Sequence, residues 1–267
     1  LSITYTGEAV MDDYGQFVAQ VYRKTGINLA DYKEAQMKRR LTSFRDREQY
    51  ASFHDMLEAF NRDPTLLERF LNRITINVSE FFRNPERWQS LQKEVLPVLA
   101  SNRAHLKCWS AACSTGEEPY TLAMILKEMG IPFELWATDI DRSVLERAKT
   151  GEYGPQAVRH VPCHFREQYF IPLENNRFRV KAELKRGIQF FQHDLLQDAY
   201  PEGCHLIVCR NVMIYFTDEA KTRIYRAFSD SLVPGGVLFV GSTEQILRPA
   251  DYGLAPLAPF MYQRVSS

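Results

Sequence analysis

The sequence predicts an α/β protein: a doubly wound parallel sheet with an N-terminal helical domain and an inserted small antiparallel β-subdomain. Three observations predict it. Apolar residues in the first third recur at helical spacing, short apolar strands alternate with helical patterns after residue 88, and the stretch between Gly151 and Gly187 breaks that alternation. Strand, helix and strand in repetition form a parallel sheet with helices on both faces.

Helix signals fill the first third of the chain. Apolar residues over 14–22 recur at helical spacing before Gly26, which is a natural stop. Ser52 precedes another apolar helical face, and Asp63-Pro64 combines an N-cap with a proline at the first helical position. We expect a helical domain over residues 11–86, after a leader or expression remnant at 1–10.

From residue 87 to 267, apolar strands and helices alternate, which predicts a single sheet domain. A last apolar run over 260–265 is expected to form a closing edge strand. The expected strands lie at 106–109, 133–138, 188–191, 206–209 and 236–240, and the expected helices at 117–129, 142–149 and 217–232.

The segment 151–187 contains neither a clean helical pattern nor a core strand. Tyr169-Phe170-Ile171 and Phe178-Arg179-Val180 are short apolar runs separated by Glu174-Asn175-Asn176-Arg177. Asparagine favours the backbone conformations of tight turns. We therefore expect an inserted β-hairpin subdomain here.

The composition is ordinary for a soluble protein and argues against two classes of function. Of the 267 residues, 45% are hydrophobic and 25% are charged. Thirty-three basic and thirty-three acidic residues cancel, which argues against general nucleic-acid binding. No apolar run approaches the roughly 20 residues that span a bilayer, and no secretory signal is visible at the start.

The five cysteines are interpreted as reduced, cytosolic residues. The alternative is a zinc site at Cys163, which lies beside His160 and His164. No second CxxC or HxxxH supplies the remaining ligands, so we expect no metal. Three cysteines in or next to apolar runs are expected to act as small buried hydrophobes: Cys108, Cys113 and Cys209.

Positive charge is concentrated in one segment of the expected helical domain. Residues 33–47 carry six basic and two acidic side chains. Such a segment is either a solvated helix face or a docking surface that attracts an acidic partner. The candidate docking residues are Lys38, Arg39, Arg40, Arg45 and Arg47.

The first expected strand leads into the loop Ala111-Ala112-Cys113-Ser114-Thr115-Gly116, which Glu117-Glu118-Pro119 follow. Small residues let the backbone approach a ligand closely, and two carboxylates would repel a phosphate. A cationic ligand with an amino group and a sulfonium fits better. The alternative is a strand-to-helix turn whose acids favour the helix dipole.

Polar residues also follow the later strands, at the edge where parallel sheets bind ligands. Asp139 stands where a ribose is held by its hydroxyls, whereas Asp141 is expected to cap the next helix. Asp194-Leu195 follows the third strand, beside an expected adenine ring. Arg210-Asn211 and Tyr215 follow the fourth, where the reacting group should lie. The alternative for Tyr215 is a packed aromatic ring with its hydroxyl in water.

A further candidate segment precedes the sheet: Asn77-Val78-Ser79-Glu80-Phe81-Phe82-Arg83. The two phenylalanines can anchor it while Asn77, Ser79 and Arg83 point into the crevice. An arginine there can hold a carboxylate by a bidentate pair. The alternative is a linker with surface charge.

Four motifs, in this order and spacing, resemble the chemotaxis receptor methyltransferases, the CheR family. The resemblance covers about residues 11–265 and implies the Rossmann-like sheet of an S-adenosylmethionine-dependent methyltransferase. The motifs that carry it lie at 77–83, 114–120, 138–141 and 209–216.

The resemblance implies methyl transfer from S-adenosylmethionine to glutamate carboxylates of chemotaxis receptors, which gives methyl esters and S-adenosylhomocysteine in sensory adaptation. A carboxylate is already ionised at neutral pH, so proximity and orientation suffice without a general base. Arg83 and Tyr215 are the implied catalytic, orienting residues; Glu118 would take the amino acid end and Asp139 the ribose. The implied cofactor contacts are Asn77, Ser79, Arg83, Glu118, Asp139, Asp194, Leu195, Arg210 and Asn211.

The resemblance also implies a partner and a location. The partner is the cytoplasmic helical domain of a chemotaxis receptor, whose acidic runs the basic segment would attract. We expect a cytoplasmic monomer, recruited to receptor arrays at the inner face of the membrane, that binds no nucleic acid and does not insert into the membrane. Some family members bind a receptor tether peptide through the hairpin, but the turn 172–178 is short here. Direct recognition of the methylation helix is therefore expected.

Two other functions would share the same cofactor site. A methyltransferase for a nucleic acid or a small molecule differs in its substrate. Enzymes that methylate base amines usually show an Asn/Asp-Pro-Pro-Tyr/Phe motif where this chain has Arg210-Asn211-Val212-Met213. A non-catalytic module would sense S-adenosylmethionine, dock on a partner and transfer nothing.

Overall fold

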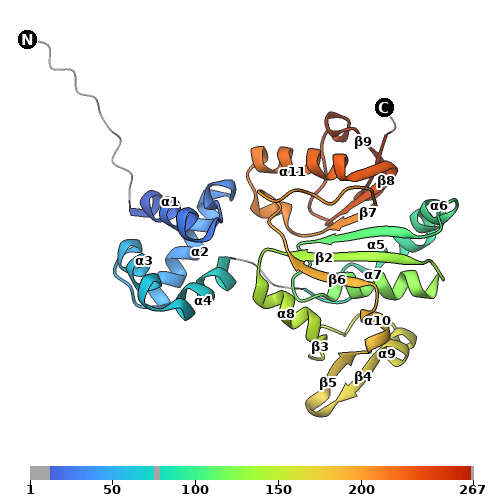
Figure 1. The fold of residues 1–267 in the computed structure, drawn as a ribbon, viewed down its shortest axis with the longest axis horizontal. Helices are drawn as coiled ribbons and strands as arrows, with labels where there is room; N and C mark the ends of the chain where they lie inside the picture. The colour runs from blue at the N-terminus through green and yellow to red at the C-terminus, as the bar shows by residue number, and fades with distance from the viewer. Residues whose placement is uncertain (1–12, 75–78, 266–267) are drawn as a thin grey trace, which may run out of the picture. The chain divides into compact units, whose positions relative to one another are not determined.

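The structure, a computed structural model, describes residues 13–74 and 79–265. The chain divides into two compact units. Unit 1 comprises Leu1–Ile76 and Tyr215–Thr217, and unit 2 comprises Asn77–Ile214 and Asp218–Ser267. Figure 1 shows the helical character of the first unit and the central sheet of the second.

In its described part, unit 1 is the expected helical bundle. Ser52 Oγ accepts a hydrogen bond from Asp55 N at 3.0 Å, and Asp63 Oδ1 accepts one from Thr65 N at 2.9 Å, so both expected caps form. Aromatic rings fill the core, among them Phe17 and Phe70. The elements are α1 (Asp13–Thr25), the 3-10 turn η1 (Leu29–Asp31), α2 (Glu34–Arg47), α3 (Phe53–Arg62) and α4 (Pro64–Ile74).

Unit 2 is built on a seven-stranded sheet in the order β6-β2-β1-β7-β8-β10-β9. The strands from β6 to β8 run parallel, whereas β10 is antiparallel to both β8 and β9. Edge strand β9 contains Pro256, which this position tolerates because it lacks a ladder partner on one side. The strands are β1 (Leu106–Ala111), β2 (Phe133–Asp139), β6 (Ile188–Gln192), β7 (Cys204–Cys209), β8 (Leu232–Val240), β9 (Leu254–Ala258) and β10 (Met261–Arg264).

Helices cover this sheet, and their apolar faces form its core. The most buried of them is α7, in which every residue from Pro119 to Leu126 is buried. The expected parallel sheet and its three helices are confirmed. The expected strand over 260–265 forms as β10, but it is not the edge strand because β9 pairs on its outer side. Neither β9 nor the helical stretch over 85–100 was predicted. The helical elements are α5 (Pro85–Ser90), the π-helical turn η2 (Leu91–Val95), α6 (Leu96–Ala100), α7 (Glu117–Glu128), α8 (Arg142–Thr150), η4 (Met213–Tyr215), α11 (Asp218–Ser231) and η5 (Pro249–Tyr252).

The insertion is a small antiparallel sheet in the order β3-β5-β4, which projects beyond α8 in Figure 1. The hairpin of β4 (Phe170–Leu173) and β5 (Arg177–Val180) is confirmed, with the turn η3 (Glu174–Asn176) between them. Both turn asparagines have positive φ. Two short helices and a third strand, which were not predicted, accompany the hairpin. α9 (Cys163–Tyr169), α10 (Ala182–Lys185) and the added strand β3 (Glu152–Tyr153) are too short to give a clear period in the sequence.

The topology places the ends of three strands side by side. β1 pairs with β2 on one flank and with β7 on the other, and all three run in the same direction. Loops that follow β1, β2 and β7 therefore emerge at one edge, at the point where the strand order reverses. Ligands bind at this position in open α/β sheets.

Candidate functional site

Backbone strain is concentrated in the segments at this edge. Ala112 and Ser114 in the loop after β1 have φ of 60° and 50°, and Asn211 after β7 has φ of 62°. In the segment before α5, Phe82 and Asn84 have φ of 52° and 58°. Non-glycine residues seldom adopt these values, and where they cluster they mark functional sites.

Gly116 fixes the path of the loop after β1. Its φ is 94°, and a Cβ atom at this position would lie 2.8 Å from the Cβ of Ala148 on α8. The loop is further anchored by the hydroxyl of Tyr153, which donates to the Thr115 carbonyl at 2.6 Å. The glycine is therefore required both by the backbone conformation and by the close approach of α8.

Asp139, at the end of β2, holds the same loop. Its Oδ2 accepts a hydrogen bond from Ser114 N at 2.8 Å, and its Oδ1 accepts one from Asp141 N at 3.0 Å. Each oxygen keeps a second lone pair, which can accept a ribose hydroxyl. Burial raises the pKa of Asp139 to about 6, against which the backbone hydrogen bonds act. Asp141 caps α8 as expected, since Asp141 Oδ1 accepts from Ser143 N at 2.8 Å.

Glu118 is the half-buried acid of the first turn of α7. Ser110 Oγ, on β1, donates to Glu118 Oε1 at 2.8 Å. Burial raises the pKa of this carboxyl to about 7, although the positive charges of Arg210 and Arg83 oppose the shift. Ionised Glu118 therefore lacks full solvation, and a bound ammonium group would supply the missing counter-charge. The residues present fit a cationic amino acid group.

Arg210 is a buried cation that connects β7 to the segment before α5. Its Nη2 donates to the Arg83 carbonyl and to Asn84 Oδ1, both at 2.8 Å. The guanidinium also lies over the rings of Trp88 and Phe239. Its Nε has no hydrogen-bond partner, and burial lowers the pKa of the group. Arg210 thus fixes the strained turn at residues 82–84.

The loop after β7 is held by Glu244, which was not predicted. Glu244 Oε2 accepts hydrogen bonds from Asn211 N at 2.6 Å and Gly241 N at 2.8 Å, and Oε1 accepts from Ile214 N at 3.3 Å. A Cβ atom at Gly241 would lie 2.4 Å from Glu244 Oε2. One buried carboxylate therefore sets the backbone at Asn211, where the reacting group is expected.

Where adenine is expected to bind, Asp194 and Leu195 already make hydrogen bonds within the loop after β6. Asp194 Oδ1 accepts from Leu196 N at 2.8 Å, Asp194 Oδ2 accepts from Gln197 Nε2 at 3.0 Å, and burial raises the pKa of this carboxyl. The Leu195 carbonyl accepts from the Tyr200 hydroxyl at 2.7 Å. These bonds order the loop after β6. The contacts of Asp194 and the Leu195 side chain with adenine stay a prediction.

The segment before α5 is anchored by its two phenylalanines. Phe81 is fully buried against Tyr153 and Phe170, and Phe82 stacks on Phe165. Phe82 N donates to Thr121 Oγ1 at 3.1 Å, which ties the segment to α7. Ser79 and Arg83 line a cavity of about 530 Å³ together with Glu117. Asn77 lies outside the described residues.

Tyr215 belongs to unit 1 by its contacts. Its carbonyl accepts from Lys33 N at 2.9 Å, while the next residue, Phe216, packs its ring on Tyr32 at a centroid distance of 5.0 Å. Tyr215 lines a cavity of about 150 Å³ with Arg39 and Arg40. Its expected role at the methyl group stays a prediction.

The five candidate docking residues lie on α2 but differ in their surroundings. Arg40 donates to the Arg73 carbonyl at 2.5 Å, and burial lowers its pKa. Arg45 is paired with Asp46 at 2.7 Å. Lys38, Arg45 and Arg47 lie over aromatic rings at 4.9, 5.0 and 5.5 Å from the centroids. Arg39 is exposed.

All five cysteines lie within the described ranges, 13–74 and 79–265. Cys108, Cys113 and Cys209 are buried as expected, and Cys163 is exposed. No group of three His, Cys, Asp or Glu side chains in these ranges could hold a metal ion. None of the helices there is long and apolar enough to cross a membrane.

Two acids of the candidate site, Glu117 and Glu244, were not among the predicted site residues. Glu117 is only 4% exposed, and its carboxylate accepts from Thr115 Oγ1 at 2.8 Å. Glu244 was missed although it follows β8 at the same edge of the sheet. The sequence signal was present: Gly241-Ser242-Thr243-Glu244 places an acid directly after a buried strand.

Comparisons with known proteins match both units of the chain. Residues 77–255 match the family described as CheR methyltransferase, SAM binding domain, and residues 12–75 match the CheR methyltransferase, all-alpha domain. A chemotaxis protein methyltransferase of Listeria monocytogenes is 46% identical over 253 residues, which cover 94% of this chain and 96% of the relative.

More distant proteins share less. A chemotaxis protein methyltransferase of Borreliella burgdorferi is 32% identical, with 88% of each chain covered. Among solved structures, a SAM-bound amino pentose methyltransferase from Micromonospora echinaspora aligns over 58% of this chain and 49% of its own, with a TM-score of 0.37 and 14% identity.

Proposed function

The chain belongs to the CheR methyltransferase family, and on that premise we propose that it methylates glutamate carboxylates of chemotaxis receptors. It is an S-adenosylmethionine-dependent methyltransferase with a role in chemotaxis. The glutamate substrate, the site residues and the receptor as partner belong to the proposal.

The observation that carries the proposal is the pair of acids at adjacent strand ends. Glu118 would hold the amino group of the cofactor, because its poorly solvated carboxylate gains most from a cationic partner. Asp139 would hold the ribose through the lone pairs that the loop leaves unused. Ser79, Asp194, Leu195, Arg210 and Asn211 would complete the contacts, with Asn77 among the residues that are not described.

The cofactor supplies an electrophilic methyl group when bound. The protein must then bring one carboxylate oxygen in line with that methyl and exclude water, which is catalysis by orientation. Arg83 and Tyr215 are the proposed orienting groups. The substrate carboxylate is ionised at neutral pH, so no side chain has to remove a proton.

The basic face of α2 is proposed to attract the acidic cytoplasmic helices of a receptor. Arg39 is best suited because it is exposed, whereas Arg40 and Arg45 already serve the helix bundle. The enzyme would act in the cytoplasm, at receptor arrays.

A labelled-methyl assay tests the proposal. The full chain is incubated with methyl-labelled S-adenosylmethionine and membranes that contain a chemotaxis receptor. We expect label on the receptor that mild alkali releases, because methyl esters are alkali-labile. Cofactor binding without any label would indicate a non-catalytic sensing module, and label on nucleic acid would indicate a different substrate class.

A further inference from the structure

An arginine-lined cavity adjoins the cofactor site within unit 2. Its volume is about 530 Å³, and its walls come from the segment before α5, the end of α8 and the small sheet. We call it the arginine cavity after the four arginines that line it: Arg83, Arg147, Arg159 and Arg177.

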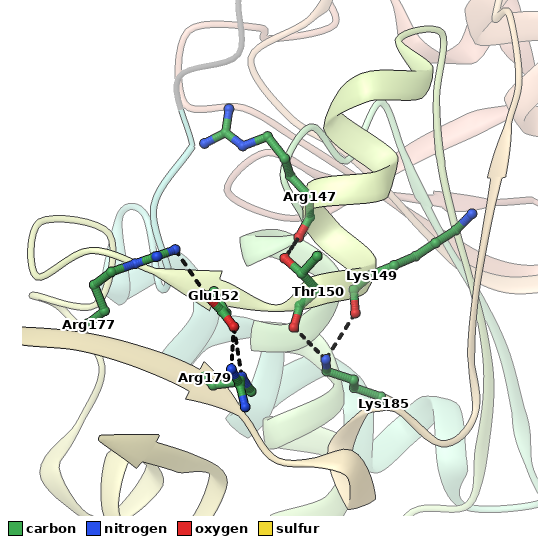
Figure 2. Close-up of polar contacts among 7 residues, drawn as sticks. All are labelled: Arg147, Lys149, Thr150, Glu152, Arg177, Arg179 and Lys185. Carbon is green, nitrogen blue, oxygen red and sulfur yellow. Dashed lines mark hydrogen bonds and ion pairs between the residues drawn. The ribbon is translucent and has the colours of Figure 1, made fainter. Parts of the chain in front are cut away.

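The carboxylates that line the arginine cavity are largely engaged in bonds with neighbouring residues. Glu152 is shared by two arginines, since Arg177 Nη2 lies 3.2 Å from its Oε2 and Arg179 Nη2 lies 2.5 Å from its Oε1. Figure 2 shows both arginines reaching this one carboxylate from β5. One negative charge therefore faces two positive charges, and an excess of positive charge remains at this wall.

Arg147 differs from Arg177 and Arg179 in its contacts. In the part of the chain that the structure describes, its guanidinium makes no hydrogen bond or ion pair. Figure 2 shows the side chain extending from α8, while only its carbonyl is bonded, to the Thr150 hydroxyl. Its charge acts on Glu117, but that carboxylate is buried and accepts a hydrogen bond from Thr115. Arg147 is exposed and can still make a bidentate pair with an incoming anion.

The walls that carry these arginines are fixed in place. Lys185 Nζ donates to the Lys149 carbonyl at 2.9 Å and to the Thr150 carbonyl at 2.6 Å, which satisfies the last turn of α8 (Figure 2). Glu80 pairs with Arg159 at 2.6 Å on another wall. Because the backbone of these walls is already held, ligand binding has to order only the arginine side chains.

We propose that the arginine cavity is a second carboxylate subsite, which takes an acidic side chain of the substrate next to the glutamate that is methylated. This inference rests on the proposed function. On a helical substrate, side chains three or four residues apart lie about 5–6 Å from each other, so an acidic residue at that spacing would reach the subsite together with the glutamate that is methylated. Arg83 lines the cavity and is also a proposed orienting group, which places the subsite beside the reacting carboxylate.

The charges that line the arginine cavity indicate which class of ligand it would bind. Four arginines are offset by three glutamates, Glu80, Glu117 and Glu152, in the same cavity. A polyanionic phosphate would be repelled by these carboxylates, whereas one side-chain carboxylate matches the single positive charge in excess. Recognition should therefore be confined to a single acidic residue of the substrate.

The test compares Arg147→Gln, Arg177→Gln and the double variant with the matched control Arg186→Gln. Arg186 is an exposed arginine of the same unit that does not line the cavity. Steady-state kinetics are measured on a receptor cytoplasmic fragment, and the cofactor Kd is measured by calorimetry. We expect KM to rise about five-fold for each single variant, as for one partly exposed ion pair. The kcat, the cofactor Kd and the control should not change.

A substrate variant identifies the partner residue. When one acidic neighbour of the methylated glutamate in the receptor fragment is changed to the amide, the KM difference between wild type and Arg147→Gln should disappear. An unchanged KM in the double variant, with normal wild-type turnover, would overturn the subsite alone. Absence of transfer to the receptor by the wild type would overturn the proposed function and the subsite together.

Discussion

Glu118 illustrates how a single residue gains its function from its surroundings. In the sequence it is one of two adjacent acids at the start of a helix, where acids are common because of the helix dipole. In the fold it lies half-buried against Ser110, and burial raises its pKa to about 7. Its neighbour Glu117 turns instead to Thr115. Only the structure separates the two roles.

The affinity for the cofactor should depend on pH through Glu118. Below pH 7 this carboxyl is mostly protonated in the free protein, so binding an ammonium group must first remove the proton. We expect the Kd for S-adenosylmethionine to rise as the pH falls from 7.5 to 6. Glu118→Gln should weaken binding by about 10- to 100-fold, as expected for a lost charge-assisted hydrogen bond. Calorimetry across this range measures both, and an equally steep profile in Glu118→Gln would exclude Glu118 as the titrating group.

Glu244 should matter to stability as well as to activity. Glu244→Ala leaves three backbone N–H groups of the loop after β7 without their acceptor. We expect a loss of about 3 kcal/mol in the free energy of unfolding, because each unsatisfied buried donor costs about 1–3 kcal/mol. Urea unfolding measures this loss. The exposed acid Glu219 on α11 provides the control, and an equal effect of Glu219→Ala would argue against the role of Glu244.

Arg83 and Tyr215 should affect turnover more than binding. If they orient the substrate carboxylate, Arg83→Ala and Tyr215→Phe lower kcat by roughly 100-fold, the effect expected when positioning is lost. The cofactor Kd should change by less than about five-fold. Single-turnover kinetics and calorimetry separate the two quantities. Normal turnover in both variants would remove these residues from the mechanism.

At the scale of elements, the face of α2 combines two tasks. Arg40 and Arg45 bond to atoms of unit 1, and Lys38 and Arg47 lie over its rings. A sequence count of positive charges cannot distinguish such residues from a free docking surface. The distinction requires the helix to be placed among its neighbours.

Charge reversal on α2 tests docking. Lys38, Arg39 and Arg47 are changed to Glu together, which spares the Arg40 and Arg45 bonds. We expect the KM for the receptor to rise about ten-fold at low salt and its salt dependence to flatten, because attraction of the acidic helices is lost. The same reversal at Arg23, Lys24 and Arg62, all exposed in unit 1, provides the control for net charge. An unaltered salt response on α2 would contradict the docking role.

The elements that could be predicted are those long enough for their apolar residues to show a clear periodic spacing. The bundle, the five parallel strands and helices α7, α8 and α11 follow from apolar spacing, and the caps Ser52, Asp63 and Asp141 form as expected. The helical stretch over 85–100 was detectable from Trp88, Leu91 and Val95, all buried. By contrast β3 and α9 pack on Phe81 and Phe82, and α10 lies against α7, so tertiary contacts rather than local preference hold these short elements.

The site was predictable as a set of strand ends but not as a network. Asp139, Glu118 and Asn211 stand where the rule for parallel sheets places them. Ser110 lies 8 residues along the chain from its partner Glu118, and Glu244 lies 33 residues from its partner Asn211. Only the three-dimensional structure reveals which acid binds which loop.

For the molecule as a whole, the buried acids of the proposed cofactor site lower the stability of unit 2 near neutral pH. Glu118 and Asp139 have pKa values of about 7 and 6 in the folded protein, above their ordinary values of 4.5 and 3.8. A carboxyl whose pKa is raised by folding stabilises the protein below its ordinary pKa, and this contribution is lost as the pH rises through the folded value. Near neutral pH the free protein therefore contains buried ionised carboxylates, and a bound cofactor would offset their unfavourable desolvation.

Unfolding measurements can isolate this contribution. All three tryptophans, Trp88, Trp109 and Trp136, lie in unit 2, so their fluorescence reports on that unit. We expect Glu118→Gln to gain stability relative to wild type between pH 5 and pH 8, by about 1–3 kcal/mol, since the amide resembles the protonated acid. A difference between the two proteins that stays constant with pH would mean that Glu118 does not titrate in this range.

The central claim is that this pocket delivers a methyl group to a receptor glutamate. The most direct measurement locates the label after incubation of the enzyme, methyl-labelled S-adenosylmethionine and receptor. The receptor is digested and its peptides are analysed by mass spectrometry. We expect methyl esters on glutamate side chains of the cytoplasmic helices, and their loss with Arg83→Ala. Label on any other residue type, or equal labelling by Arg83→Ala, would contradict it.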